Sequence, residues 1–246
     1  MSGDTSGDVR VGAASRGSPA RVVCLEGPSA VGKTTLATAL VREVGAAVVP
    51  ELDTRTAPPA SQSAAWFVDH HAEQWRRAQA LAGAAPLVVL DGDPFKGLWY
   101  NWVYAADGWP GVDVVAPLYR ARIAAGTLDV PDLYVVLGAT EAQLRERRAG
   151  DPARSRRHFE PHLRLVGPQR RYFAALAAAD PARVLWLETT AQEVLAETVL
   201  AAVASLPPGP PDSLGLLDRV AEWVHAQPPI GGPLDPSSLP PNGPGV

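Results

Sequence analysis

Apolar residues along this chain fall into two alternating patterns. Short, almost continuous apolar runs predict buried strands of a parallel sheet, and they cover residues 20–26, 46–49, 87–90, 133–137 and 183–187. Longer stretches repeat apolar residues every three or four positions, which predicts helices, and they cover residues 33–44, 64–81, 97–106, 112–125, 140–148, 158–179 and 191–205. This alternation predicts an α/β fold: a five-stranded parallel sheet flanked by helices, with right-handed crossovers.

The two ends of the chain lack this alternation. Residues 1–19 are rich in Gly, Ser, Asp and Ala, and we expect a disordered tail there. Eleven of the 25 prolines lie in the last 40 residues, a composition that favours extended chain. We therefore expect one domain over residues 20–205 and a Pro-rich extension over 206–246. That extension is expected to contain one short amphipathic helix with the apolar residues Leu214, Leu217, Val220, Ala221 and Val224.

The charge balance and the cysteine content narrow the class of partner. A net charge of −4, from 22 basic and 26 acidic residues, gives no overall attraction to nucleic acid or to a membrane surface. No stretch reaches 18 uninterrupted apolar residues and the N-terminus carries no apolar h-region, so we expect neither a membrane span nor a secretion signal. The single Cys24 excludes a disulfide framework, which favours a cytoplasmic protein. The oligomeric state stays open, with a homodimer as one option.

The most specific motif follows the first predicted strand. Residues 27–34 fit the phosphate-loop (Walker A) pattern G-x-x-x-x-G-K-[ST], and a helix is predicted directly after it. Glycines allow the backbone to wrap a phosphate chain, while backbone N–H groups and the helix N-terminus attract its negative charge. Lys33 is expected to reach the β- and γ-phosphates, and the Thr34 hydroxyl to ligate Mg²⁺. The predicted nucleotide-binding residues are Gly27, Pro28, Ser29, Ala30, Val31, Gly32, Lys33, Thr34 and Thr35.

Acidic residues follow the second predicted strand and end the third. Since ligands bind outside the carboxyl ends of parallel strands, we expect Glu51 and Asp91 at the same sheet edge as the phosphate loop. Asp91 can bind Mg²⁺ or its waters, or it can contact the substrate hydroxyl, so Glu51 and Asp91 compete for the role of base. Asp93 comes two residues later, although Asp-Gly and Asp-Pro also form turns that have no further function.

With these features the chain resembles the P-loop kinases of small molecules, especially nucleoside and nucleotide kinases such as deoxynucleoside and thymidylate kinases. The resemblance covers about residues 20–205. It rests on the phosphate loop, on Val49-Pro50-Glu51 after the second strand, and on an arginine-rich segment with Arg145, Arg147, Arg148, Arg154, Arg156 and Arg157. It implies a P-loop NTPase fold that binds ATP and Mg²⁺.

The resemblance also implies roles for single residues. Glu51 matches the glutamate that accepts the proton of the attacking sugar hydroxyl in deoxynucleoside kinases. The arginine-rich segment matches a lid that closes over ATP and brings arginines to the transferring phosphate. Arg148 and Arg154 flank the expected bend at Gly150-Asp151-Pro152 and are the preferred pair, while a solvated helix face explains most of the other arginines.

The chain departs from this family after the third strand. Relatives have Asp-Arg or Glu-Arg there, and their arginine helps to bind substrate or phosphate. This chain has Asp91-Gly92 instead, and Lys96 is a candidate for the missing charge. The departure keeps open an acceptor other than a standard nucleoside or nucleotide.

Aromatic residues crowd the segments that build the acceptor pocket in this fold: nine of them lie within 44 residues, from Trp66 to Trp109. They can line a pocket or pack helices together. His70 and His71 are adjacent on a predicted helix and do not share a face, so we expect no metal site there. The candidate pocket residues are Glu51, Trp66, Asp93, Phe95, Lys96, Trp99, Tyr100 and Asn101.

The function predicted from the sequence is an ATP- and Mg²⁺-dependent kinase that acts on a small hydroxylated acceptor. The acceptor is expected to be a nucleoside- or nucleotide-like compound, or else a non-nucleotide natural product such as an antibiotic. A different class of function, an NTP-binding regulatory switch with slow hydrolysis, also stays open. Against it, the chain has no Asn-Lys-x-Asp motif for guanine specificity.

Overall fold

Five parallel strands form the centre of the molecule. This computed structural model describes residues 20–51, 63–150, 159, 163–188, 192–228 and 230. Within them the strands are β1 (Arg21–Glu26), β2 (Ala47–Val49), β3 (Leu87–Asp91), β4 (Leu133–Gly138) and β5 (Val184–Glu188). Their order in the sheet is β2-β3-β1-β4-β5, and every neighbouring pair is parallel. The predicted fold class, a five-stranded parallel α/β sheet, is confirmed.

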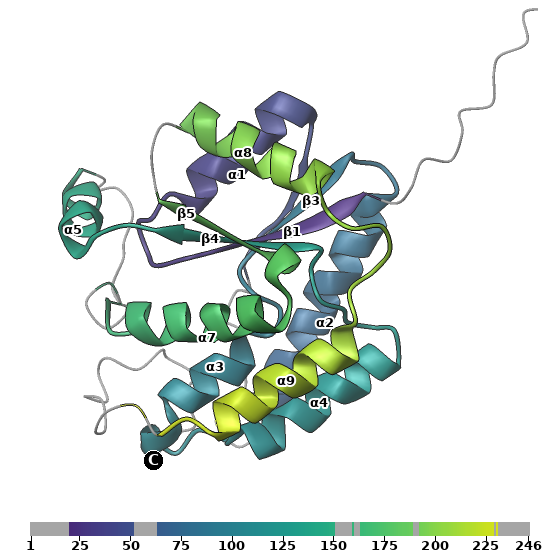
Figure 1. Ribbon diagram of the computed structural model, residues 1–246, viewed down its shortest axis with the longest axis vertical. Coiled ribbons are helices and arrows are strands. Elements are labelled where there is room, and N and C mark those ends of the chain that lie inside the picture. The colour runs from purple at the N-terminus through teal and green to yellow at the C-terminus, as the bar shows by residue number, and fades with distance from the viewer. Residues whose placement is uncertain are drawn as a thin grey trace, which may run out of the picture.

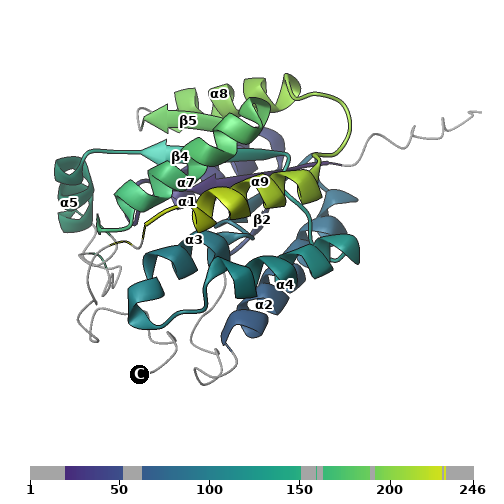
Figure 2. The same ribbon diagram turned by 60° about the horizontal axis from the view of Figure 1, so that its bottom comes forward.

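Helices cover both faces of the sheet, as Figures 1 and 2 show. One face carries α1 (Lys33–Val44) and α8 (Gln192–Ala204). The other face carries α2 (Ser63–Ala82), α3 (Lys96–Val103), α4 (Val112–Ala124), α7 (Val166–Ala179) and α9 (Ser213–His225). Helix α5 (Glu141–Ala149) stands apart, beyond the carboxyl end of β4, and two 3-10 turns are η3 (Ala105–Asp107) and η4 (Pro181–Arg183).

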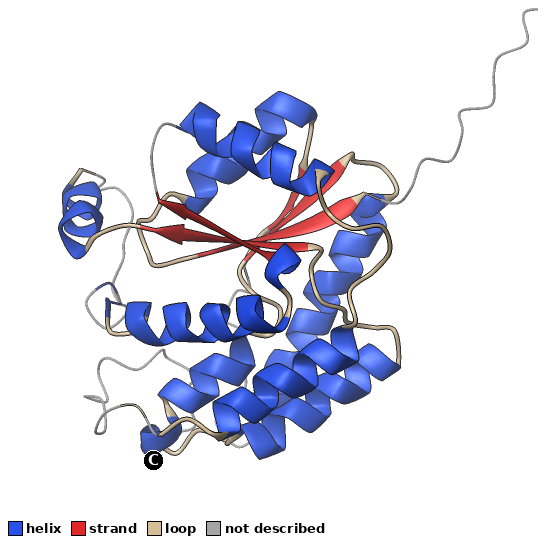
Figure 3. Ribbon diagram, in the orientation of Figure 1, coloured by secondary structure: helices blue, strands red, loops and turns tan. Residues whose placement is uncertain are grey.

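The alternation of side chains along β1 explains why both faces of the sheet are covered. Val22 and Cys24 belong to the hydrophobic cluster beneath α2, α3, α4, α7 and α9. Val23 and Leu25 belong to the separate cluster beneath α1 and α8. Each of these four side chains is at most 2% exposed. A strand that is apolar on both faces needs a layer of helices on each side, which is the arrangement seen in Figure 3.

The ends of α1 agree with the sequence signals. The helix begins after Gly32, whose φ of 110° lies in the left-handed region, and ends at Gly45 with φ 70°. The Gly45 N–H bonds back to the carbonyl of Val41, as in a glycine C-cap. At α5, Thr140 and Gln143 form a capping box. Local sequence therefore sets both ends of α1 and the start of α5.

Two predicted helices differ from those in the structure. The single helix expected over 97–106 ends at Val103, and the 3-10 turn η3 follows, closed by Gly108 with φ 80°. The helix expected near 158–179 begins at Val166. Residues 151–158 and 160–162 lie outside the described residues, and with them Arg154, Arg156 and Arg157 of the predicted lid.

Helix α9 belongs to the same packed body as the sheet, although the sequence suggested an extension from residue 206. Its side chains Leu216, Leu217, Val220 and Val224 are each at most 3% exposed and join the cluster that contains Val22 of β1. The helix lies against α3, α4 and α7. The packed body thus continues through His225, because the apolar face of α9 covers apolar surface that those helices would otherwise expose. The predicted tail 1–19 and residues 231–246 lie outside the described residues.

All five strands end at one edge of the sheet, on the left in Figure 1. The phosphate loop follows β1 at this edge, Pro50 and Glu51 follow β2, and Asp91 ends β3.

None of the described helices is long and apolar enough to cross a membrane.

Candidate active site

The phosphate loop is a tight turn whose shape depends on glycine. Gly27 has φ 139°, and a Cβ at this position would lie 2.5 Å from the carbonyl oxygen of Leu137. Ala30 and Gly32 also have positive φ, 70° and 110°. Lys33 folds back over the loop, and its Nζ donates to the Gly27 carbonyl at 2.8 Å. Thr34 and Thr35 are exposed in the first turn of α1, so loop amides, ammonium and hydroxyls gather at one helix N-terminus.

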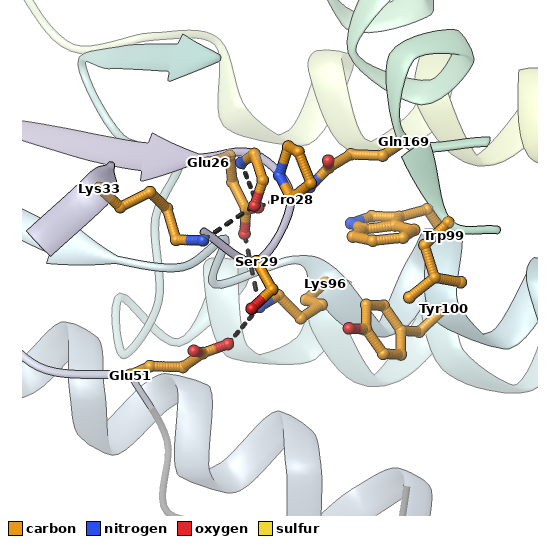
Figure 4. A pocket seen from close by; sticks show the side chains of 11 residues that line it. Glu26, Pro28, Ser29, Lys33, Glu51, Lys96, Trp99, Tyr100 and Gln169 are labelled. Atoms are coloured by element: carbon orange, nitrogen blue, oxygen red, sulfur yellow. Dashed lines mark hydrogen bonds and ion pairs between the residues drawn. The ribbon is translucent and has the colours of Figure 1, made fainter. Parts of the chain in front are cut away.

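A cavity of about 150 Å³ adjoins this loop. It brings together the loop, the residue after β2, the start of α3 and the start of α7 (Figure 4). Of the predicted acceptor residues, Glu51, Lys96, Trp99 and Tyr100 line it. The complete lining is Glu26, Gly27, Pro28, Ser29, Lys33, Glu51, Lys96, Trp99, Tyr100, Leu165 and Gln169.

Lys96 is the central charge of the cavity. Its Nζ lies 2.6 Å from Glu51 Oε1, 3.5 Å from Glu26 Oε1 and 5.7 Å from the centre of the Tyr100 ring. Burial by itself would lower the pKa of Lys96. The charges of Glu26 and Glu51 outweigh that effect and raise the pKa well above its usual value. Lys96 is therefore a permanent cation placed between two carboxylates.

Gly92 explains how Lys96 reaches this position. Its φ of 99° strongly favours glycine, and a Cβ there would lie 3.3 Å from Lys96 Nζ and 3.5 Å from Glu51 Oε1. The space beside residue 92 is thus filled by the amine of Lys96. A larger side chain at position 92 would strain the backbone and crowd the Lys96–Glu51 pair.

Asp91 carries an unpartnered carboxylate oxygen. Its Oδ1 is buried and has no hydrogen-bond partner among the described residues. Burial raises the pKa of Asp91, and the charge of Lys33 opposes that rise. Asp91 does not line the cavity of about 150 Å³. A buried carboxylate oxygen close to a phosphate loop suits a cation or a hydroxyl donor.

Asp93 lies beneath the cavity rather than in its wall. It is 1% exposed. Its Oδ1 accepts hydrogen bonds from the Phe95 N–H at 2.8 Å and from the Tyr134 hydroxyl at 3.2 Å. Burial, and then the charge of Glu26, raise the pKa of Asp93 to about 7. These contacts organise the turn between β3 and α3.

The remaining predicted pocket residues make contacts away from the cavity. Trp66 stacks on His70, with ring centres 3.6 Å apart, and Phe95 packs against Tyr119 at 5.0 Å. The Asn101 amide donates to the Pro110 carbonyl at 2.8 Å. None of Trp66, Phe95 and Asn101 is among the lining residues.

The two histidines on α2 have separate surroundings, and His70 Nδ1 lies 3.1 Å from the carbonyl oxygen of Trp66. His71 is buried, and burial lowers its pKa to about 3. Its Nδ1 lies 3.0 Å from the Tyr119 hydroxyl, an internal contact between α2 and α4. Over the part of the chain that the structure describes, no group of three or more His, Cys, Asp or Glu residues could bind a metal ion.

Three cavity residues were missed by the sequence analysis: Glu26, Leu165 and Gln169. Glu26 had a visible signal, because it is a charged residue that follows the apolar run of residues 22–25 directly before the loop. Gln169 is buried on α7 and donates from Nε2 to Glu26 Oε2 at 2.7 Å. Nothing in its local sequence marked it, since only the packing of α7 against the loop brings it there.

Of the arginine-rich segment, the structure describes the three arginines on α5. Arg147 donates to the carbonyl of Val31, in the phosphate loop, at 3.1 Å. The Arg148 guanidinium lies 4.7 Å from the centre of the Phe159 ring, and Arg145 pairs with Glu141 at 2.7 Å. The contact with the loop carbonyl of Val31 is thus made by Arg147, whereas Arg148 was the predicted residue and Arg154 lies outside the described residues.

A second, smaller cavity of about 70 Å³ lies on the other side of the loop, at the carboxyl ends of β4 and β5. It shares Pro28 and Gln169 with the first cavity. Its wall includes Trp186, which is 40% exposed, and Arg170, whose guanidinium lies 6.0 Å from the Trp186 ring centre.

Known proteins are similar to this chain in structure but not detectably in sequence. No protein-family model matches the chain, and no curated protein matches it by sequence. The structure of thymidylate kinase from Candida albicans superposes with a TM-score of 0.53 at 14% identity, over 76% of this chain and 92% of that one. This chain has the fold of a P-loop kinase. Deoxyadenosine kinase from M. mycoides matches with a TM-score of 0.47 at 11% identity, over 75% of this chain and all of the other.

Proposed function

We propose that this P-loop kinase-like chain is an ATP- and Mg²⁺-dependent phosphotransferase. It would transfer the γ-phosphate to a hydroxyl, or a phosphate, of a small nucleoside- or nucleotide-like acceptor. One observation supports this most directly: the phosphate loop, Glu51 and Lys96 line a single cavity with the aromatic residues Trp99 and Tyr100. Donor-binding groups and a carboxylate suited to an acceptor hydroxyl therefore face the same space.

At the donor end, the loop amides and Lys33 would bind the triphosphate. To do so, the Lys33 ammonium would leave the Gly27 carbonyl, which it contacts at 2.8 Å. Thr34 and Asp91 supply the oxygen ligands that Mg²⁺ prefers, and the unpartnered Asp91 Oδ1 is the observation that fits a cation. When bound, Mg²⁺ would neutralise the developing charge on the β- and γ-phosphates.

At the acceptor end, Glu51 would take the proton of the attacking hydroxyl. As the acceptor oxygen bonds to the γ-phosphorus, the bond from that phosphorus to the β–γ bridging oxygen breaks, and ADP leaves with the electron pair. Lys96, at 2.6 Å, fixes the Glu51 carboxylate at the cavity rim. An oriented carboxylate is sufficient because phosphoryl transfer depends on positioning more than on a strong base. Arg147, and residues of the predicted lid such as Arg148 and Arg154, would add positive charge near the loop.

The aromatic wall favours a planar acceptor. Trp99 and Tyr100 line the cavity with ring centres 4.4 Å apart, and the indole Nε1 of Trp99 is buried without a hydrogen-bond partner in the described part of the chain. In Figure 4 that nitrogen faces the side of the cavity where Pro28 lies. A planar ring could stack on Tyr100, the more exposed of these two side chains.

The smaller cavity beside Pro28 is the corresponding candidate for the base of the donor nucleotide. Trp186 and Arg170 give it a planar, cationic wall, and it adjoins the same loop that would bind the phosphates. Aromatic and guanidinium planes both stack on nucleobases.

A second candidate function is the phosphorylation of a non-nucleotide natural product. It is favoured by one observation: the chain has Gly92 where nucleoside and nucleotide kinases usually have an arginine, and the lysine beside it, Lys96, pairs with two carboxylates. The acceptor screen below separates the two candidates.

The test is a phosphoryl-transfer assay with radiolabelled ATP and Mg²⁺ against panels of nucleosides, nucleoside monophosphates and hydroxylated antibiotics. The Lys33→Ala variant, checked for an unchanged melting temperature, is the control, because Lys33 lies in the loop and not in the core. We expect an acceptor-dependent phosphorylated product that Lys33→Ala fails to form. If the variant retains transfer, the phosphate-loop assignment is wrong. ATP turnover without any acceptor dependence would instead support the regulatory-switch function.

A further inference from the structure

Glu26 is a buried carboxylate that the proposed reaction does not use. It is 2% exposed. Its Oε1 accepts from the Asp93 N–H at 2.6 Å and pairs with Lys96 Nζ at 3.5 Å. Its Oε2 accepts from Gln169 Nε2 at 2.7 Å and from the Gly27 N–H at 3.1 Å. Both oxygens therefore have two partners each (Figure 4 shows the side-chain pairs).

The four partners belong to four different parts of the site. Gly27 is the first residue of the phosphate loop, Asp93 is in the turn after β3, Lys96 begins α3 and Gln169 is on α7. Gly27, Lys96 and Gln169 all line the cavity. A single carboxylate thus joins the loop proposed for the donor to both helices that form the acceptor wall.

A buried carboxylate of this kind needs a physical reason. Removing an ionised carboxyl from water is unfavourable, and its partners offset that cost only if every oxygen is satisfied. Here one ammonium and three N–H donors satisfy it. An apolar residue at position 26 would avoid this cost. However, Lys96 would then have only Glu51 as a carboxylate partner, and the three N–H groups that donate to Glu26 would lose their acceptor.

We propose that Glu26 is a positioning residue that couples occupancy of the phosphate loop to the acceptor wall. The inference rests on the proposed function. In the structure the Gly27 N–H bonds to Glu26, while the Gly27 carbonyl accepts from Lys33 at 2.8 Å. A bound triphosphate draws the Lys33 ammonium away and changes the field at Gly27. Glu26 passes that change to Lys96 and Gln169, and therefore to the Tyr100 ring beneath Lys96.

Such coupling is a free energy shared between two sites, and it is reciprocal. If Glu26 had only a structural role, its loss would lower the stability of the fold. The acceptor wall would still respond to a bound nucleotide. The measurement must therefore record both quantities on the same sample.

The experiment uses the full chain labelled with 3-fluorotyrosine. The chain has five tyrosines, and the Tyr100→Phe variant assigns the Tyr100 resonance. The unreactive ATP analogue AMP-PNP is titrated with Mg²⁺, and the dissociation constant and the Tyr100 fluorine shift are read together. In the parent protein we expect saturable binding and a Tyr100 shift.

In Glu26→Gln we expect the analogue to bind within about tenfold of the parent dissociation constant, with loss of the Tyr100 shift. The glutamine keeps the size of the side chain but removes the anion that pairs with Lys96, and its NH₂ group faces other donors. Lys96→Gln is the second variant in case Glu26→Gln does not fold. It leaves Glu26 its three N–H donors, breaks the link to Tyr100, and should also lose the shift.

Ser213→Ala is the matched control for a lost buried hydrogen bond. Ser213 is 6% exposed and its hydroxyl accepts from the Val130 N–H, before β4, at the opposite edge of the sheet from the cavity. We expect it to lower the melting temperature while keeping the whole Tyr100 shift. Loss of the shift in this control would mean that destabilisation alone explains the effect, and the inference would be wrong.

The remaining outcomes separate the inference from the proposed function. Failure of the parent to bind AMP-PNP would overturn both. Binding without a Tyr100 shift in the parent would overturn the coupling and leave the proposed function standing. A Tyr100 shift that persists in Glu26→Gln, or in Lys96→Gln if the first variant is unfolded, would show that the analogue acts on Tyr100 directly, and the coupling would again be rejected.

Discussion

At the scale of single residues, three carboxylates close together in the fold have different surroundings. Glu51 lies at the cavity rim, 2.6 Å from Lys96. Asp91 Oδ1 and Asp93 Oδ2 are each buried without a hydrogen-bond partner in the described chain, while Asp93 Oδ1 accepts from Phe95 and Tyr134. We therefore propose three separate roles for these similar side chains: proton acceptor for Glu51, metal ligand for Asp91 and organiser of a turn for Asp93. Each role can be tested by one isosteric substitution.

Glu51→Gln tests the proton acceptor. The variant should still bind ATP and acceptor, because the size and hydrogen-bonding reach of the side chain survive. We expect kcat to fall by roughly 10²–10⁴, the usual contribution of a positioned base, without a change in Mg²⁺ dependence. Steady-state kinetics over a range of Mg²⁺ concentrations measures both effects.

Asp91→Asn is the companion substitution. If Asp91 binds the metal, this variant should need more Mg²⁺ for its half-maximal rate and regain part of the lost activity at high Mg²⁺. Should Glu51→Gln show that rescue and Asp91→Asn none, the two assignments must be exchanged. A loss of less than about threefold in both variants would mean that neither carboxylate takes part in the chemistry.

Asp93 makes stability depend on pH in a direction opposite to that of most surface acids. Burial, with the charge of Glu26, raises its pKa from 3.8 to about 7, so between these values the folded protein binds more protons than the unfolded chain. The free energy of unfolding contributed by this group therefore falls as pH rises from about 4 to 7. Below that window both states are protonated, and above it the full cost of burying the charge is present.

Asp93→Asn removes this titration while keeping an oxygen for Phe95 and Tyr134. We expect its melting temperature, relative to that of the parent, to be higher at pH 8 than at pH 5. His71, whose pKa is lowered to about 3, makes stability fall at low pH, but it is present in both proteins and cancels from the difference. Thermal melts of both proteins at pH 5 and pH 8 test this prediction. An equal difference in melting temperature between variant and parent at both pH values would contradict the assigned titration of Asp93.

At the scale of secondary structure, the sequence predicted what depends on local pattern. The five strands and α1 were found because apolar runs and glycine caps are readable without tertiary information. The change from α-helix to 3-10 turn at Tyr104, within the helix predicted over 97–106, was missed, because Gly108 marks only the end of that turn. Gln169 was missed because its role arises only when α7 packs against the loop, whereas Glu26 was missed although its charge at the end of an apolar run was a visible signal. The periodicity of apolar residues does not predict contacts between elements that are distant in the chain.

Helix α5 provides a prediction at this scale. Arg147 on α5 donates to the Val31 carbonyl at 3.1 Å and so joins this helix to the phosphate loop. Arg147→Gln should weaken ATP binding about tenfold or more, because a hydrogen bond from a charged donor contributes roughly 1.5–3 kcal/mol. Arg145→Gln is the control, since Arg145 sits on the same helix but pairs with Glu141. Titration calorimetry with AMP-PNP compares them, and equal losses in both variants would rule out a specific Arg147 contact.

At the scale of the whole molecule, α9 packs against both helices that line the cavity, α3 and α7. It packs against α3, which carries Lys96, Trp99 and Tyr100, and against α7, which carries Gln169. Trp223 of α9 meets Trp102 of α3 edge to face, with ring centres 5.3 Å apart. The Trp102 indole N–H then donates to the Pro228 carbonyl at 3.0 Å. The C-terminal part of the described chain is thus structural, in contrast to the extension expected from its proline content.

Two shortened chains separate the helix from the segment after it. A chain ending at Gln227 loses only the Pro228 carbonyl and the partly buried Ile230 from the described contacts, so we expect a melting temperature lower by a few degrees and an unchanged kcat. A chain ending at Pro211 lacks all of α9 and exposes the surfaces that Leu216, Leu217 and Val220 cover. It should fail to fold, because each buried leucine contributes about 2 kcal/mol or more. Circular dichroism melts and the transfer assay compare both chains with the parent. A large loss of kcat in the chain ending at Gln227, without loss of stability, would instead show that residues after 227 act in the active site or in a partner subunit.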